Sequence, residues 1–201
     1  MAMSRHSVGP RRSDETMNAI LKAAESLVLE AGHAGFSFEA VARRAHAGKP
    51  TIYRWWPNKF ALLKDIYERR NHGAAPIFKD SFEEDIAACL TQVFNSWSRG
   101  SGQILQCMFA EAVSAPLVKS SLRQVVFQTF RQMETAFTAA ISRGEVHSAT
   151  DVQHAIEIIA SYSVAHLLVA DAVRPNLNQV ASWFAHGMTA GGVDLIQKQV
   201  R

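Results

Sequence analysis

Hydrophobic residues recur three and four positions apart along most of the chain, the spacing that places side chains on one face of an α-helix. The first such run includes Ile20 and Val28. Ser13 is a suitable N-cap for this helix, and Gly32 and Gly35 are expected to end it. No segment shows the strict alternation of polar and apolar residues that is typical of a half-buried strand. The pattern therefore predicts an all-α protein.

Three short helices are predicted next. Ser37 can cap the first of them, which Gly48 ends. The second covers about Lys49–Trp55 with Pro50 in its first turn, where a missing N–H costs little, and the third begins after Asn58. Two short helices joined by a turn with a glycine, between supporting helices, are typical of a helix-turn-helix unit.

The second short helix is the one expected to read DNA. Ile52 and Trp56 are spaced to anchor it on the core. Its exposed positions supply donors for base edges and phosphates, from Lys49, Thr51, Tyr53 and Arg54.

Longer helices are predicted beyond residue 80. Capping-box sequences begin at Ser81 and at Thr150. The expected helices cover residues 82–97, 103–113, 116–143, 151–173 and 178–198, and residues 98–102 are expected to form a loop.

The last two of these helices are predicted to form a homodimer interface, over about Asp151–Val173 and Asn178–Lys198. The former is apolar on more than one side, and a helix of this kind must be buried nearly all round, which is hard to achieve within one small domain. In the latter, Gly187 and Gly191 are one turn apart and permit close helix approach. The alternative is a core helix that packs only within its own chain.

The composition narrows the class of protein. The 201 residues are 48% hydrophobic and 19% charged, which is typical of a globular chain and excludes wholesale disorder. No apolar run reaches the length of a membrane span, and the first residues lack the apolar core of a leader, so we expect a soluble, cytoplasmic protein. The two cysteines, Cys89 and Cys107, exclude a disulfide framework and are expected to be buried.

The charge is unevenly distributed. The net charge is +3, but residues 1–72 hold 12 Lys and Arg against 7 Asp and Glu, whereas the remainder holds 9 against 11. Clustered positive charge binds phosphate by releasing condensed counterions, so a polyanion is expected to meet the first third of the chain. An ordinary solvated face is the alternative.

The segment SFEAVARRAHAGKPTIYRWWPNKFALL resembles the N-terminal DNA-binding domain of the TetR family of transcriptional regulators, and the resemblance extends over about residues 13–70. It is carried by the spacing of Gly32 and Gly35, by Phe38, Gly48 and Tyr53, and by the run from Pro57 through Lys59 to Leu62 and Leu63. Lys49 departs from the pattern, because the family has Val there. In the later part, the resemblance is limited to helix order and the segment 141–146.

The resemblance implies a role for each matching residue. Ser37, Tyr53 and Lys59 would bind phosphate, and Arg44 would reach a base edge. Lys49, Pro50, Thr51 and Arg54 would face the major groove. Trp55 would be divided between backbone contact and packing.

The expected organisation is a basic arm over residues 1–12, a helix-turn-helix DNA-binding domain over 13–72, and a helical effector-binding and dimerisation domain over 73–201. The arm carries Arg5, Arg11 and Arg12. It is expected to be disordered, and the alternative is an arm that enters a minor groove.

The resemblance also implies a small-molecule effector pocket among the later helices. The candidate lining residues are Phe94, Trp97, Met108, Phe130, Met133, Tyr162 and His166, for which core packing is the alternative. His154, Glu157 and His166 do not suffice for a metal site, and no catalytic motif occurs, so we expect no metal, cofactor or enzymatic activity.

The sequence thus predicts a homodimer that binds double-stranded DNA at a pseudo-palindromic operator and represses transcription in response to a ligand. The rival hypothesis is an all-helical small-molecule binding protein or enzyme without a DNA role. Steep loss of DNA affinity with salt would separate the two.

Overall fold

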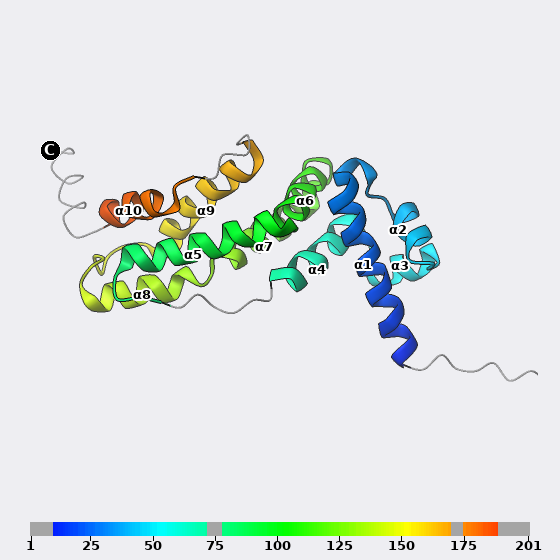
Figure 1. Cartoon of the computed structure of the whole chain (residues 1–201), viewed down its shortest axis with the longest axis horizontal. Helices are drawn as coiled ribbons and strands as arrows, with labels where there is room; N and C mark the ends of the chain where they lie inside the picture. The colour runs from blue at the N-terminus through cyan, green and yellow to red at the C-terminus, as the bar shows by residue number, and fades with distance from the viewer. Residues whose placement is uncertain (1–9, 72–77, 170–174, 189–201) are drawn as a thin grey trace, which may run out of the picture. The chain divides into compact units, whose positions relative to one another are not determined.

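Residues 10–71, 78–169 and 175–188 are described by a computed structural model, shown in Figure 1. These residues form helices and no strand, so the predicted all-α class is confirmed. The chain divides into two compact units. The first consists of Met1–Arg70 and Gln103–Lys119, and the second of Asn71–Gly102 and Ser120–Arg201. Residues 103–119 therefore cluster with the N-terminal helices, although the sequence analysis grouped them with the later ones.

In the part of it that the structure describes, the first unit contains four consecutive α-helices and one later α-helix. They are α1 (Pro10–Gly35), α2 (Phe38–Arg44), α3 (Lys49–Trp55), α4 (Lys59–Asn71) and α6 (Gly102–Ser114). In this unit α2 packs against both α1 and α3 (Figure 1). The buried side chains at its centre include Ile20, Val28, Val41, Ile52 and Leu63.

The predicted start of the first helix is wrong. The helix begins at Pro10 and Ser13 lies inside it, because proline is well suited to the first turn of a helix. Of the predicted N-terminal arm, residues 1–9 with Arg5 lie outside the described residues, whereas residues 10–12 are helical. At the other end, Gly32 adopts a φ of 60° and a ψ of −158°, so regular helix geometry stops where the sequence predicts.

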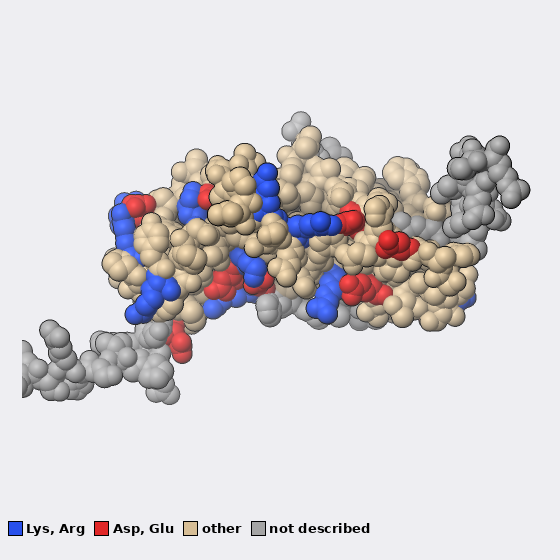
Figure 2. All heavy atoms as spheres, turned by 180° about the vertical axis from the view of Figure 1, so that it is seen from behind, with Lys and Arg blue, Asp and Glu red and all other residues tan. Residues whose placement is uncertain are grey.

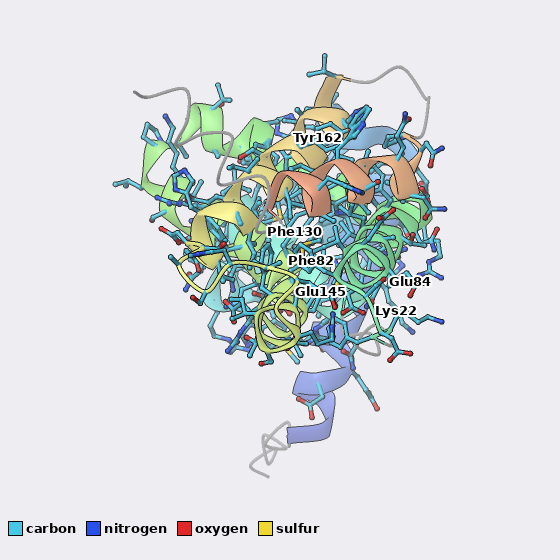
Figure 3. The ribbon with its side chains drawn as sticks, turned by 90° about the vertical axis from the view of Figure 1, so that its left-hand side faces the viewer. Lys22, Phe82, Glu84, Phe130, Glu145 and Tyr162 are labelled. Carbon is cyan, nitrogen blue, oxygen red and sulfur yellow. The ribbon has the colours of Figure 1, made fainter. Side chains whose placement is uncertain are left out.

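Within its described residues, the second unit is built from five α-helices. They are α5 (Phe82–Ser96), α7 (Lys119–Phe130), α8 (Met133–Arg143), α9 (Val152–Val169) and α10 (Leu177–Met188). Both α8 and α10 pack against α5, and α9 packs against α8. The buried rings of Phe82 and Phe137 meet edge to face with their centroids 4.8 Å apart. Figure 3 shows Phe82 and Phe130 lying among the helices.

Three local predictions for this unit are wrong. Residues 97–101 continue as a π-helical turn instead of a loop, with a kink at Gly100 where φ is 112°. The helix predicted over 116–143 is divided, because Arg131 and Glu134 each donate a backbone N–H to the carbonyl three residues back and thereby form tight turns between α7 and α8. Asp151, and not Thr150, caps α9 by accepting from the His154 N–H at 3.0 Å.

A buried carboxylate ties the start of α5 to the end of α8. Asp85 has no exposed surface, and it accepts from the backbone N–H of Lys79 at 2.5 Å and from Arg143 at 3.3 Å. Arg143 also binds Glu145, which accepts from the Phe82 N–H at 2.5 Å. Gly144 between them has a φ of 76°, a left-handed conformation that favours glycine. The segment 141–146 therefore holds the end of α8 against the start of α5.

Candidate nucleic-acid interface

The start of α2 is fixed by a cap and a buried ring. Ser37 Oγ accepts from the Ala40 N–H at 3.2 Å, which confirms the predicted cap. Phe38 is buried, and its ring meets the edge of the Tyr53 ring with the centroids 4.9 Å apart. The hydroxyl hydrogen of Ser37 is not used by this cap, so the same side chain can still donate to a phosphate.

The turn between α2 and α3 differs from the expected one in its backbone. Gly48 has a φ of −72° and a ψ of 139°, an extended conformation open to any residue, and it serves as the N-cap of α3. The left-handed residue of the turn is His46, with a φ of 50°. The backbone strain of the turn therefore lies at His46, and the conformation at position 48 does not require a glycine.

α3 presents a polar face and buries an apolar one. Ile52 and Trp56 are buried, as predicted, and Trp56 Nε1 donates to Asp65 at 3.2 Å. The exposed residues of α3 are Lys49, Pro50, Tyr53 and Arg54, while Thr51 and Trp55 are half-buried. This division is the one that a helix needs in order to sit on a core and enter a major groove.

The two tryptophans and Arg54 are stacked at the end of α3. The Trp55 ring lies edge to face with the Trp56 ring at 5.7 Å, and the Arg54 guanidinium lies 5.2 Å from the centroid of the Trp55 ring. A guanidinium over an indole is attracted by the ring quadrupole. Trp55 thus supports Arg54 as well as packing on the helix anchor.

Three of the predicted DNA-binding cations pair with carboxylates of the first unit. Lys49 Nζ lies 2.5 Å from Glu39 Oε1, and Arg44 Nη1 lies 2.7 Å from Glu30 Oε2. On the face shown in Figure 2, Lys and Arg side chains are interspersed with carboxylates and do not form one continuous patch. A phosphate or base that takes these cations must therefore compete with a carboxylate already in place.

The third pair joins α4 to α6. Asn58 caps α4 as predicted, with Oδ1 accepting from the Ala61 N–H at 2.8 Å, and Lys59 is the first residue of the helix. Lys59 Nζ binds Glu111 Oε1, the same oxygen that lies 2.6 Å from His33 Nε2. The Glu111 side chain is only 14% exposed, so it is largely withdrawn from water while it holds two basic groups.

No pattern in the sequence placed Glu30, Glu39 or Glu111 at this site. Glu39 carried a usable signal, since it is the only acidic residue between Glu30 and Asp65 in the basic third of the chain. Glu111 carried none, because it lies 78 residues from His33 and meets it only after folding.

The predicted effector residues fall into separate groups. The Trp97 ring lies 5.3 Å from that of Phe94 and 6.1 Å from that of Phe130, and all three are buried. Met133 is buried in the same unit, whereas Met108 is buried in the first unit. The expected grouping of Met108 with the rest is therefore not supported by the division into units.

A second aromatic group joins α9 to α10. Tyr162 lies 4.8 Å from the ring of His166 and 6.0 Å from that of Phe184, which the sequence analysis did not include among the effector residues. His166 Nδ1 is buried and has no hydrogen-bond partner among the described residues. A buried nitrogen of this kind is costly unless a ligand or water satisfies it.

Both cysteines are buried, as predicted, and burial raises the pKa of Cys89 to about 12. Within residues 10–71, 78–169 and 175–188, no three His, Cys, Asp or Glu side chains are placed to hold a metal ion. Glu157 instead binds Arg123.

Two family models match the chain. Residues 20–66 match the model described as bacterial regulatory proteins, tetR family, and residues 79–182 match the model described as tetracyclin repressor-like, C-terminal domain. The second match alone covers more than half of the 201 residues. The chain belongs to the TetR family.

Individual TetR-family relatives agree with this assignment. The uncharacterized HTH-type transcriptional regulator YdeS of Bacillus subtilis (strain 168) is 27% identical over 163 residues, which are 80% of this chain and 82% of that protein. The DNA-binding transcriptional repressor TetR of Mycobacteroides abscessus is 42% identical over 53 residues, 26% of this chain and 28% of that one. A TetR transcriptional regulator from Agrobacterium tumefaciens shares the fold, with a TM-score of 0.62 at 16% identity over 92% of this chain and 98% of that chain.

Membership of the TetR family confirms the resemblance predicted from the sequence. It makes the chain a DNA-binding transcriptional regulator. The residues matched by the N-terminal model include the whole of α2 and α3. Which side chains touch DNA stays a prediction.

Proposed function

We propose that the protein is a homodimeric repressor that reads a pseudo-palindromic operator with α3 and releases it when a small molecule binds. The observation that carries the proposal is the division of α3, which buries Ile52 and exposes Lys49, Tyr53 and Arg54. These three side chains supply the donors that phosphates and base edges require. We place the protein in the cytoplasm and assign it no enzymatic activity.

The dimer is supported by apolar side chains that the chain leaves exposed on its last two described helices. Trp183 of α10 is 63% exposed, and Ile158, Leu168 and Val169 of α9 are exposed as well. Removing these apolar side chains from water by packing them against a partner would stabilise a dimer. By length and composition α9 also passes as a candidate membrane span, but a single such helix is weak evidence, and a helix that packs on a second subunit has the same composition. The predicted extensions to residues 173 and 198 lie outside the described residues.

Sedimentation velocity tests the dimer. The wild-type chain should sediment with twice the mass of one subunit, and Trp183→Glu should sediment as a monomer because it places a charge in the apolar contact. Val113→Glu is the matched control, since Val113 is 80% exposed on α6 and lies outside the proposed interface. If both variants sediment as monomers, or both as dimers, α9 and α10 do not form the dimer interface.

A twofold dimer supports operator symmetry, because it presents two copies of α3 to half-sites about one helical turn, or a multiple of it, apart. Selection of duplexes from a random pool, followed by fluorescence anisotropy on the enriched sequence, tests this point. An enriched motif should show two inverted half-sites and an affinity that falls steeply with salt. A chain that enriches nothing at low ionic strength would overturn the proposed function.

The effector response is supported by the aromatic group of Tyr162, His166 and Phe184 with its buried, unsatisfied nitrogen. A ligand acts only through its different affinities for the DNA-bound and DNA-free states. Thermal-shift screening should identify binders, and anisotropy in their presence should show weakened DNA binding. If every binder leaves the DNA affinity unchanged, the regulatory part is wrong.

Repression is supported by the Mycobacteroides abscessus relative, which is named a DNA-binding transcriptional repressor. A reporter gene placed behind the selected operator tests the sign. Expression should fall when the protein is supplied, and activation of the reporter would reverse the assignment.

A further inference from the structure

Glu39 and Lys49 form an ion pair between the first turns of α2 and α3. Lys49 Nζ donates to Glu39 Oε1 over 2.5 Å, and about half of each side chain is exposed. The pKa of Glu39 is lowered, first by this hydrogen bond, then by its own backbone N–H and by the charge of Lys49. Glu39 is therefore ionised at neutral pH. Exposed pairs contribute little to stability, so its contribution must be sought in binding.

The packing beneath the pair fixes its position. Phe38 directly precedes Glu39 and is buried, and its ring contacts Tyr53, which lies one turn after Lys49. Ile52 anchors the same helix in the core. Because both backbones are held, the carboxylate and the ammonium group meet at a defined place on the exposed face of α3.

The chemistry of the pair selects one kind of base pair. A lysine by itself is a flexible point charge that binds any nearby phosphate. When Glu39 takes one of the three ammonium donors, two remain, and guanine offers O6 and N7 as neighbouring acceptors in the major groove. The second oxygen of Glu39 can accept from the N4 amino group of cytosine, whereas a phosphate repels it. A G·C pair satisfies both partners.

We propose that Glu39 is a specificity-determining residue, which holds Lys49 over one position of each half-site and thereby makes a G·C pair necessary there. The proposal rests on the proposed DNA-reading role of α3. The pair thereby makes Lys49 the reader of a base and not a general phosphate contact.

Removal of the carboxylate should separate affinity from selectivity. In Glu39→Gln, the ammonium group is free to reach the nearest phosphate, and a negative charge disappears from the DNA-facing surface. Affinity for unselected DNA should therefore rise while the guanine preference falls. Glu39→Asp keeps the charge but shortens the reach, so it should reduce the preference without raising affinity for unselected DNA.

The experiment is selection from a random duplex pool at one salt concentration, with deep sequencing, on the full chain. The variants are Glu39→Gln, Glu39→Asp, Lys49→Val and the double variant Glu39→Gln with Lys49→Val. Glu68→Gln is the matched control, because it removes the same charge from the Lys64 pair on α4, whose atoms are 2.8 Å apart. Circular dichroism melting checks that each variant is folded.

The wild-type motif should contain guanine at one position per half-site, with a preference on the order of 5- to 150-fold, the range of good bidentate contacts. Glu39→Gln and Lys49→Val should each lose most of this preference at that same position, and the double variant should match Lys49→Val. Glu68→Gln should leave the motif unchanged.

The outcomes separate this inference from the function on which it rests. A wild-type chain that enriches no motif overturns the proposed function and the role of the pair together. A wild-type motif that Glu39→Gln or Glu39→Asp leaves intact overturns the role of Glu39 alone. The role of Glu39 is also overturned if Glu39→Gln loses the guanine preference at a position other than the one that Lys49→Val affects.

Discussion

Lys59 is the residue whose proposed phosphate contact can be tested most quantitatively. It is the first residue of α4, and in the DNA-free protein it binds the largely buried carboxylate of Glu111. Lys59→Ala removes one cation from each subunit, and therefore two from a dimer on its operator. Phosphate contacts contribute to affinity through counterion release, so the effect of this substitution must depend on salt.

The expected magnitude follows from the number of contacts. Each neutralised phosphate contributes about −0.9 to the slope of log K against log salt, so the dimer should lose about 1.8 units of slope. Over the range from 50 to 200 mM salt, the affinity loss caused by Lys59→Ala should thus shrink by about 12-fold. The Glu111 pair opposes the contact. Because the Lys59 side chain is 34% exposed, the pair is worth only about 0.2–1 kcal/mol, and Glu111→Gln should raise affinity about 1.4- to 5-fold per half-site.

Fluorescence anisotropy on one operator duplex, repeated at five salt concentrations, measures both quantities. Lys64→Ala is the matched control, since it removes a cation from the same helix at a residue outside the proposed contacts. An unchanged slope for Lys59→Ala would remove Lys59 from the interface. A lower affinity for Glu111→Gln would show that the carboxylate supports Lys59 and does not compete with DNA for it.

The remaining predictions concern stability and reactivity. His46→Val should lower the free energy of unfolding in urea by about 1–2 kcal/mol, because His46 has a φ of 50°. Gly48→Ala should leave it unchanged, since the new methyl group would meet only Pro50 and Thr51, at the ordinary contact distances of 3.7 and 3.9 Å. Arg143 lowers the pKa of Glu145 below its ordinary value of 4.5, so the pair stabilises the protein at neutral pH and this stabilisation is lost as the pH falls through the folded-state pKa. The melting temperature of Glu145→Gln should accordingly fall less on acidification than that of the wild type. Neither Cys89 nor Cys107 should react with a thiol reagent at pH 8 before unfolding, because burial raises the pKa of both thiols, and rapid labelling of the native chain would contradict this burial.

The elements of the DNA-binding unit were predictable because their determinants are local. Ser37 and Asn58 cap the helices they precede, and the predicted bounds of α3 match those in the structure. Ile52 and Trp56 were identified as anchors from spacing alone. Caps and hydrophobic spacing act within one or two turns, so they can be recognised in the sequence.

What the sequence did not predict depends on contacts between distant residues. The carboxylate partners of Lys49, Arg44 and Lys59 come from α2, α1 and α6, and no spacing rule connects such positions. The division between α7 and α8 and the π-helical turn after α5 also violate no local rule. The helical pattern continues in the sequence across the division between α7 and α8, whereas Ser98 to Gly102 indicated a loop where the π-helical turn forms.

The occupied state of the basic side chains has a consequence for how the protein searches a chromosome. A regulator competes for its operator against millions of other sites, which hold it mainly through charge. Under the proposed contacts, a randomly placed phosphate must displace a carboxylate from Lys49, Arg44 or Lys59, so we expect residence on unrelated sequence to be brief.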